Sequence, residues 1–186
     1  MQSEETSLPG VLHILPKVFG DARGFFVETY QFDRYAKAGV ALPFVQDNLS
    51  RSRHGVLRGL HLQNPNAQGK LVSVVDGTVL DVAVDVRVGS PHFGAHVAVE
   101  LDATRMNQLW VPPGFAHGFV VLSEFATFSY KCTDRYAPEH EVGVAWDDPA
   151  IGIDWRVAAP SLSEKDLKLP KLADIPHDKL VRYEAP

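Results

Sequence analysis

The sequence predicts an all-β protein built as a sandwich of two antiparallel sheets, and three observations support this fold class. The 186 residues include 14 glycines and 13 prolines, which is high for a helical protein. These residues interrupt the chain roughly every 8 to 12 positions, the spacing typical of an all-β sandwich or barrel. Between the interruptions lie short stretches rich in Val, Phe and Thr, residue types that favour strands.

One short helix is predicted ahead of the C-terminal tail, over residues 31–39. Phe32, Tyr35 and Ala36 recur there at helical spacing, and Gly39 stands where helices commonly end. It is predicted to lie at the periphery of the sandwich.

The remaining elements are predicted from apolar stretches and turn residues. Strands are predicted over 71–75, 79–88, 95–101, 108–111, 118–122 and 127–133. The dipeptide Asp76-Gly77 accepts the positive φ of a tight primed turn, so a hairpin is predicted around it. From Pro149 onward prolines interrupt regular structure, and only residues 161–168 favour a helical turn or two. The tail is predicted to be a loop-rich cover within one domain spanning 1–186.

Composition excludes several classes of protein. The chain carries 18 Lys and Arg against 23 Asp and Glu, a formal net charge of −5. Because nucleic-acid affinity comes largely from neutralising phosphates, this balance argues against a nucleic-acid partner. No apolar run is long enough for a transmembrane helix, and the N-terminus lacks the features of a signal peptide. Cys132 is the only cysteine, which excludes an intrachain disulfide and suits a reducing compartment, so a cytoplasmic protein is predicted.

Polar residues break the apolar pattern in three places. Arg58, His61 and Gln63 lie in a segment that otherwise favours a strand, and His61 and Gln63 would share one face of it. In the second place, a Pro-Gly turn leads His117 into the start of an apolar strand. The third is the segment 128–131 within the last predicted strand, which contains Tyr130, with Tyr136 six residues beyond it. A single histidine in a β protein is most often structural, but two histidines in comparable settings indicate a functional site.

A metal site is the first function to test against these histidines. A metal-binding cupin would place a second histidine two residues after His61, where this chain has Gln63, and the next glutamate is Glu100. His61 and His117 remain, which is two ligands where catalytic metal sites usually have three. No metal is therefore predicted, and a histidine without a metal can act as a base.

The chain closely resembles the dTDP-4-dehydrorhamnose 3,5-epimerases from about residue 8 to about residue 168. Several long motifs occur in the right order and at the right spacing, which makes the resemblance specific. The matching segments are VFGDARGFFVETY (18–30), FVQDNLSRSRHGVLRGLHLQ (44–63), NAQGKLVSVVDGTVLDVAVDVRVGSPHFG (66–94), QLWVPPGFAHGFVVLSE (108–124) and WDDPAIGIDW (146–155).

The resemblance implies a cupin-type jelly roll that needs no metal and no other cofactor. It also implies a homodimer that exchanges N-terminal strand material, and open sheet edges independently favour such an exchange. The implied substrate is dTDP-4-dehydro-6-deoxy-D-glucose, and the implied reaction inverts C3 and C5 on either side of the C4 ketone. The product would serve dTDP-L-rhamnose synthesis.

This reaction requires a base, a positive charge at the ketone oxygen and an acid on the opposite face of the sugar. By resemblance, His61 is the base and Asp166 is the carboxylate that pairs with it. Lys70 stabilises the enolate oxygen, and Tyr130 returns a proton from the other face.

The resemblance also implies a set of binding residues. Phe19, Arg23 and Glu28 would reach the nucleotide in the partner's site, and Tyr136 would stack on thymine. The remaining positions implied to contact the substrate are Gln46, Asp47, Asn48, Arg58, Gln63, His117, Glu141 and Lys165. Arg135 stands directly before Tyr136, where relatives carry a second tyrosine.

Three alternatives compete with the double epimerase. The nearest is an epimerase that inverts one carbon only, 3- or 5-, of a dTDP-4-keto-6-deoxy sugar in antibiotic sugar biosynthesis. A cupin that only binds a nucleotide sugar would have no use for the combination of His61, Lys70 and Tyr130. A metal-dependent cupin oxygenase would require bound metal, and chelation would abolish its activity.

Overall fold

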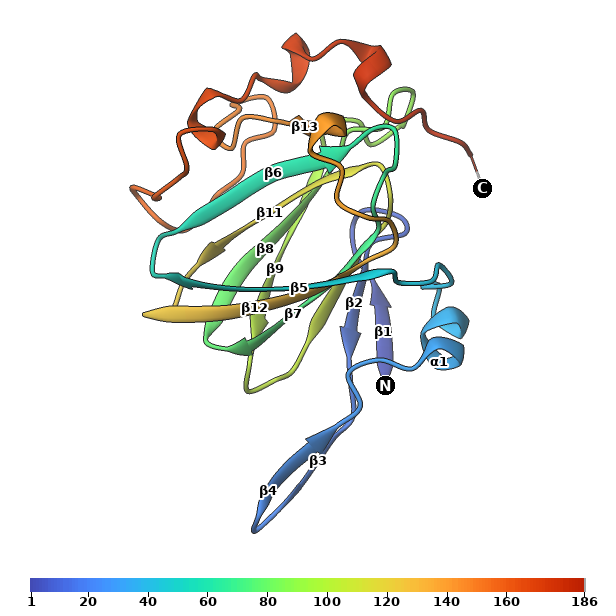
Figure 1. Ribbon diagram of the computed structural model, residues 1–186, viewed down its shortest axis with the longest axis vertical. Helices are drawn as coiled ribbons and strands as arrows, with labels where there is room; N and C mark the ends of the chain where they lie inside the picture. The colour runs from blue at the N-terminus through green and yellow to red at the C-terminus, as the bar shows by residue number, and fades with distance from the viewer. Residues whose placement is uncertain (186) are drawn as a thin grey trace.

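The computed structural model describes residues 1–185, and most of its strands form two antiparallel sheets that face each other (Figure 1). The first sheet has the strand order β1 (Gln2–Glu5), β2 (Leu12–Leu15), β10 (Gln108–Val111), β7 (Lys70–Asp76), β12 (Phe125–Cys132) and β5 (Gln46–Arg53). The second sheet has the order β13 (Glu141–Gly143), β6 (Leu57–Gln63), β11 (Phe115–Val121), β8 (Thr78–Asp85) and β9 (His96–Asp102). The predicted all-β sandwich is confirmed.

The core is divided over three layers because both sheets are covered on their outer sides. Between the sheets, Val72 and Val74 pack with Phe115 and Phe119. Alternate residues of β8 point in opposite directions, as in any strand. Leu80, Val82 and Val84 therefore point outward and pack under the C-terminal tail.

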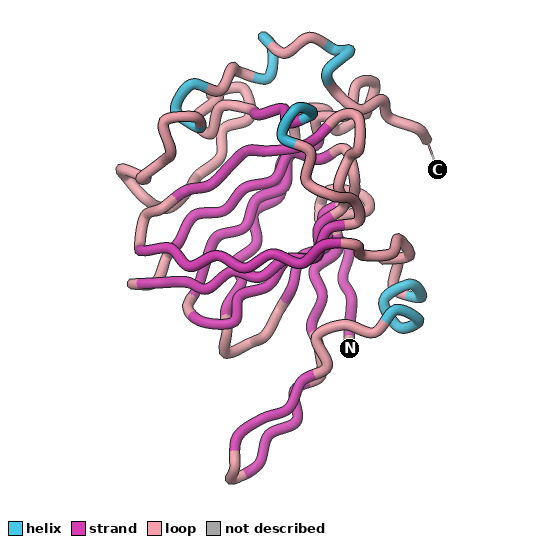
Figure 2. The backbone as a smooth tube through the Cα atoms, in the orientation of Figure 1, coloured by secondary structure: helices cyan, strands magenta, loops and turns pink. Residues whose placement is uncertain are grey.

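The C-terminal tail covers the outer side of the second sheet with loops and short helical turns (Figure 2). The turns are η2 (Asp166–Lys168), η3 (Leu172–Asp174) and η4 (His177–Lys179), and a further turn, η1 (Pro138–His140), precedes β13. Leu172, Ile175 and Leu180 are each buried against the sheet. The predicted loop-rich cover is confirmed, and burial of its apolar side chains holds it in place.

The predicted helix is confirmed as α1 (Phe32–Lys37), which covers the outer side of the first sheet. Gln31 caps it, because its side-chain oxygen accepts a hydrogen bond from the Arg34 N–H at 2.8 Å. Tyr35 is buried and donates from its hydroxyl to the Gln108 side chain at 2.7 Å, which ties the helix to β10. No helix within residues 1–185 is long and apolar enough to cross a membrane.

The hairpin predicted around Asp76-Gly77 is wrong. β7 pairs with β10 and β12, whereas β8 pairs with β9 and β11, so this turn carries the chain from one sheet to the other. Gly77 does adopt a positive φ of 85°. Asp-Gly chemistry thus indicated the conformation of the turn but could not indicate the pairing of its strands.

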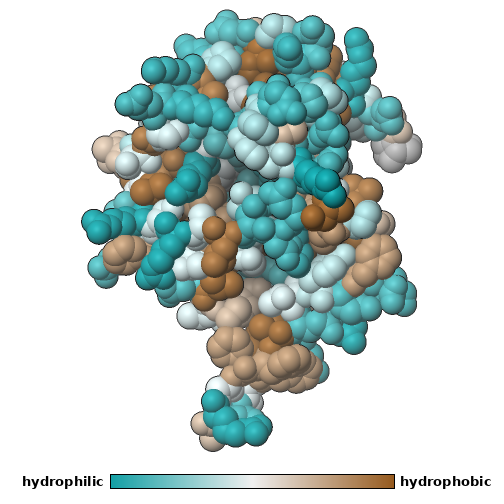
Figure 3. All heavy atoms as spheres, in the orientation of Figure 1, coloured by the Kyte–Doolittle hydropathy of each residue, from teal (hydrophilic) through white to brown (hydrophobic). Residues whose placement is uncertain are grey.

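A two-stranded arm, β3 (Val18–Asp21) and β4 (Gly24–Val27), projects away from the sandwich (Figure 1). Its aromatic side chains are unusually exposed: Phe19 is 52%, Phe25 61% and Phe26 67% accessible. In the space-filling view, apolar side chains gather where the arm leaves the body (Figure 3). An isolated hairpin is marginally stable in water, so this arm calls for a surface to pack against.

Candidate active site

A cavity of about 590 Å³ lies between the two sheets, at the end that the apolar core does not fill. Strands β5, β7 and β12 of the first sheet and β6 and β11 of the second contribute side chains to it, and the C-terminal tail closes one side. The predicted site residues that line it are Gln46, Asn48, Arg58, His61, Gln63, Lys70, His117, Tyr130, Tyr136, Glu141, Lys165 and Asp166.

Two glycines let β6 and β11 approach closely beside the two histidines. His61 and His117 are cross-strand partners, and the register shifts just beyond them. A Cβ on Gly59 would lie 2.6 Å from the Cα of Gly118, and one on Gly118 would lie 2.7 Å from the carbonyl oxygen of Arg58. Gly59 also has a positive φ of 132°. Any larger residue at either position would move the strands that carry the histidines.

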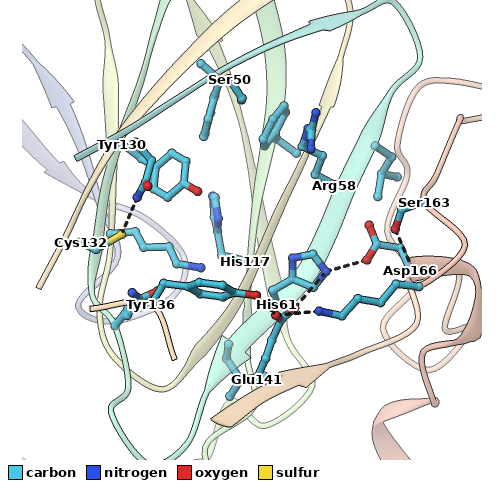
Figure 4. Close-up of a pocket in the computed structure, with 18 of the residues that line it drawn as sticks. Ser50, Arg58, His61, His117, Tyr130, Cys132, Tyr136, Glu141, Ser163 and Asp166 are labelled. Carbon is cyan, nitrogen blue, oxygen red and sulfur yellow. Dashed lines mark hydrogen bonds and ion pairs between the residues drawn. The ribbon is translucent and has the colours of Figure 1, made fainter. Parts of the chain in front are cut away.

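His61 is paired with Asp166, 105 residues later in the chain (Figure 4). Nε2 of His61 lies 2.7 Å from Oδ1 of Asp166, which is 5% exposed. Because a carboxylate only accepts, Nε2 carries the hydrogen and the lone pair of the imidazole stays on Nδ1.

Asp166 is kept ionised by its surroundings. Burial alone would raise the pKa of this carboxyl, but bonds from His61, Ser163 and the backbone N–H of Gly59 outweigh burial and hold it below its ordinary value. The Ser163 hydroxyl also accepts from the Asp166 backbone N–H at 3.1 Å, which fixes the start of η2. The base and its carboxylate are therefore held in one arrangement.

Lys70 and Tyr130 enter the cavity from the opposite sheet, on adjacent strands β7 and β12. Burial lowers the pKa of the Lys70 ammonium and raises the pKa of the Tyr130 phenol. The phenol is thus a protonated acid through neutral pH. Cys132, the register partner of Lys70, is a buried free thiol whose pKa burial raises.

His117 is held by a carboxylate that the sequence analysis did not single out. Its Nε2 lies 3.0 Å from both side-chain oxygens of Asp81, which is fully buried on β8. The imidazole also stacks on Phe128, with ring centroids 6.3 Å apart. An aspartate inside an otherwise apolar strand was the signal that could have found Asp81.

Tyr136, Glu141 and Lys165 form a bonded group at the mouth of the cavity (Figure 4). The Tyr136 hydroxyl donates to Oε2 of Glu141 at 2.7 Å, and Nζ of Lys165 lies 2.7 Å from the same oxygen. Burial would raise the pKa of Glu141, but bonds from Lys165 and Tyr136 outweigh burial and lower it. Glu141 Oε1 also lies 3.8 Å from Nε2 of His61, so this group adjoins the base.

Arg58 lies at the exposed rim of the cavity. Its Nε and Nη2 atoms donate to the Ser52 hydroxyl at 3.3 and 3.2 Å, which orients the guanidinium. Its remaining N–H groups can bind phosphate oxygens, for which the planar fork of arginine is suited.

The structure does not bring four predicted residues into this cavity. Asp47 follows the alternation of β5 onto the other face of the strand, where it pairs with Lys131 at 3.0 Å. Phe19 and Arg23 lie on the projecting arm, and Arg23 bonds Asp21. Glu28, just beyond the arm, pairs with Arg34 at 2.7 Å.

Besides Asp81, the cavity contains functional candidates that sequence reasoning missed or left aside. Ser50 lies on the same face of β5 as Asn48, and Ser163 supports Asp166. Alternation along β5 and the capping position three residues before Asp166 were the available signals. Within residues 1–185, no group of three or more His, Cys, Asp or Glu side chains is placed to hold a metal ion.

Comparison with known proteins gives consistent results. A family model described as dTDP-4-dehydrorhamnose 3,5-epimerase matches residues 5–174. The dTDP-4-dehydrorhamnose 3,5-epimerase of Pseudomonas aeruginosa is 53% identical over 176 residues, which cover 94% of this chain and 97% of the relative.

Two solved structures show the same fold. One is a dTDP-6-deoxy-D-glucose-3,5-epimerase from Legionella pneumophila in complex with dTDP-4-keto-L-rhamnose, with a TM-score of 0.97, 49% identity and 99% coverage of both chains. The other is a 3'-monoepimerase from Streptomyces bikiniensis in complex with dTDP-quinovose, with a TM-score of 0.85 and 37% identity over 90% of this chain and 86% of that one. The predicted cupin-type jelly roll is confirmed by this likeness.

Proposed function

The chain belongs to the dTDP-4-dehydrorhamnose 3,5-epimerase family, and from this premise we propose that it inverts C3 and C5 of dTDP-4-dehydro-6-deoxy-D-glucose. The product is dTDP-4-dehydro-L-rhamnose, an intermediate of dTDP-L-rhamnose biosynthesis. The observation that carries the proposal is the placement of His61 and Tyr130 on opposite sheets, facing one cavity that also contains Lys70.

Proton removal is assigned to Nδ1 of His61. A C–H bond beside the C4 ketone breaks, its proton moves to Nδ1, and its electron pair enters the enolate. Asp166, 2.7 Å from Nε2, stabilises the imidazolium that forms. Lys70 is the residue that stabilises the enolate oxygen, because a desolvated ammonium is a strong electrostatic partner for developing negative charge.

Proton return is assigned to Tyr130. The phenol gives its proton to the carbon from the face opposite His61, and a new C–H bond forms with inverted configuration. Solvent then removes the proton from His61 and restores the phenol. The same residues serve C3 and C5, since both carbons adjoin the same ketone.

Binding of the nucleotide is assigned to residues at the cavity mouth. Tyr136 offers an exposed aromatic face for thymine. Arg58 at the rim and His117, buried deeper in the cavity, are assigned to the diphosphate and the sugar. Lys165 and Glu141 close this side of the site through their ion pair.

We further propose a homodimer in which the arm of one copy completes the site of the other. The exposed aromatic residues of the arm support this, as does the presence on it of Phe19 and Arg23, outside their own chain's cavity. A second copy is the partner that would cover these apolar side chains. The cytoplasm is the proposed location, in keeping with the free thiol of Cys132.

The test is proton NMR of dTDP-4-dehydro-6-deoxy-D-glucose with the protein in D₂O. We expect loss of the proton signal at both C3 and C5, and we expect the His61→Ala variant to abolish it. His177→Ala, a histidine variant in the tail, serves as the matched control. Exchange at one carbon alone would instead assign the single-site epimerase, and exchange that persists in His61→Ala would contradict the assignment of the base.

A further inference from the structure

Gln63 lines the cavity, but both hydrogens and the oxygen of its side-chain amide are already bonded to the backbone of its own chain. We propose that Gln63 acts on the nucleotide indirectly, by fixing the loop 134–137 so that the ring of Tyr136 is held ready as a stacking face. Gln63 is therefore a positioning residue. The inference rests on the proposed function only in placing the nucleotide base against Tyr136.

Each polar atom of the Gln63 amide is bonded to the backbone around it. Its Nε2 donates to the carbonyl oxygens of Asn66 at 2.9 Å and of Arg135 at 3.1 Å. Its Oε1 accepts from the backbone N–H of Ala137 at 2.9 Å. A primary amide has two donor hydrogens, and both are used. Gln63 is also 3% exposed, so it binds the residues on both sides of Tyr136 and leaves Tyr136 itself free.

A second glutamine holds the same loop from the opposite sheet. Oε1 of Gln46, on β5, accepts from the backbone N–H of Tyr136 at 2.9 Å. Gln68 adds a bond from its Nε2 to the carbonyl oxygen of Asp134 at 2.8 Å. The loop between β12 and β13 is therefore fastened to both sheets by side-chain amides, independently of regular strand pairing.

The hydroxyl end of the Tyr136 side chain is fixed from β13, at the position that pairs with Gln63 of β6. Glu141 is the cross-strand partner of Gln63, and it accepts from the Tyr136 hydroxyl at 2.7 Å. One strand pair thus fixes the backbone of Tyr136 through Gln63 and its hydroxyl through Glu141. The residue remains 54% exposed, which leaves a face for a planar ligand. Fixing a group before binding removes the entropic cost of ordering it on binding.

The first experiment measures dTDP affinity by titration calorimetry, together with kcat and KM, for Gln63→Met. We expect a dTDP dissociation constant and a KM that rise about 3- to 10-fold with kcat nearly unchanged, because only the ordering of Tyr136 is lost. Gln108→Met is the matched control. Gln108 is likewise 3% exposed and bonds the Thr29 carbonyl oxygen at 2.9 Å, but it lies outside the cavity. We expect the control to lower Tm and leave dTDP affinity unchanged.

A double-mutant cycle with Tyr136→Ala separates positioning from direct contact. If Gln63 acts through Tyr136, Gln63→Met weakens dTDP binding in the wild-type background and has no further effect in Tyr136→Ala. Additive losses would overturn the inference, since they would mean that Gln63 contacts the ligand. Should Tyr136→Ala alone leave dTDP affinity unchanged, the stacking assignment in the proposed function fails instead. If Gln63→Met does not fold, the neutral Gln63→Asn variant, whose shorter side chain does not reach the same partners, carries the same cycle.

Discussion

At the scale of single residues, the cavity contains groups whose protonation is set by burial and by bonded partners. Burial favours the neutral form of Lys70 and of Tyr130, whereas the bonds to Asp166 favour its charged form. These opposite effects arise within one cavity because Asp166 has several donors around it. The rate of the reaction should therefore fall at high pH and at low pH for different reasons, the first through Lys70 and the second through Asp166.

Lys70 is expected to set the alkaline limb. Burial lowers its pKa below the ordinary value of 10.5, so the ammonium loses its proton earlier than a surface lysine does as pH rises. Tyr130 has a raised pKa and keeps its proton longer. We expect Lys70→Met to reduce kcat by about 10²- to 10³-fold and to remove the alkaline fall in the residual rate. A pH profile of kcat for both proteins checks this, and an unchanged alkaline limb in the variant would contradict it.

Ser163 is expected to affect the acid limb through Asp166. Its bonds help to lower the pKa of Asp166, so Ser163→Ala should raise that pKa towards the ordinary value. Because the carboxylate is ionised only above its pKa, the acid fall in kcat/KM should move to higher pH. We expect kcat at neutral pH to drop about 2- to 10-fold, the value of one net hydrogen bond. Ser73→Ala, whose hydroxyl bonds a carbonyl outside the cavity, is the control, and an acid limb that stays in place would refute the role.

The sequence identified the site residues that lie in motifs of the family, but not the contacts that depend on how distant strands pair. His61, Lys70, Tyr130 and Asp166 were proposed by resemblance, and the structure places them around one cavity. Asp81 was visible as an aspartate within an apolar strand, but its contact with His117 could not be predicted, because it depends on the pairing of β8 with β11.

At the scale of elements, the close approach of β6 and β11 determines where the two histidines lie. We expect Gly118→Ala to destabilise the protein by about 1 to 3 kcal/mol, because the added methyl meets the Arg58 carbonyl oxygen with no room to relax. The same displacement should reduce kcat, since His61 lies on the strand that moves. Thermal unfolding and kinetics test this. Gly20→Ala, where the nearest atom is 3.8 Å away, should leave Tm unchanged.

Strand prediction succeeded where apolar stretches were bounded by turns. It also succeeded for the segment that contains Arg58, His61 and Gln63, which is β6, but other strands were missed. The strands from β7 to β12 lie close to the predicted ranges, and β10 coincides with its range. β5 was missed because its sequence, QDNLSRSR, directs polar side chains both to the cavity and to solvent. The arm was missed as a pair of strands since its aromatic residues are exposed, which gives no alternation of buried and exposed positions.

At the scale of the whole molecule, the proposed exchange of arms predicts complementation between two inactive variants. His61→Ala lacks the base but has an intact arm, and Arg23→Ala lacks an arm residue but has the base. Mixing the two after unfolding and refolding should restore about a quarter of the wild-type activity, because half of the dimers are mixed and each has one complete site. The assay is epimerase activity of the refolded mixture.

The control for complementation is a mixture of His61→Ala with Asp166→Asn. Both defects lie in the same cavity of one chain, so exchange of arms cannot produce a complete site, and no recovery is expected. Equal recovery in the two mixtures would contradict the exchange, as would a molecular mass in sedimentation that corresponds to a single chain.

The order in which the chain is synthesised gives the pairing of β2 with β10 a further consequence. The ribosome releases β1, β2 and the aromatic arm first, but the strand that joins them to the sheet, Gln108–Val111, emerges about 100 residues later. Asp166, which completes the base, emerges later still. Such long-range antiparallel pairing folds slowly, so the nascent protein must hold strand β2 unpaired on this side until well over half of its residues have been joined.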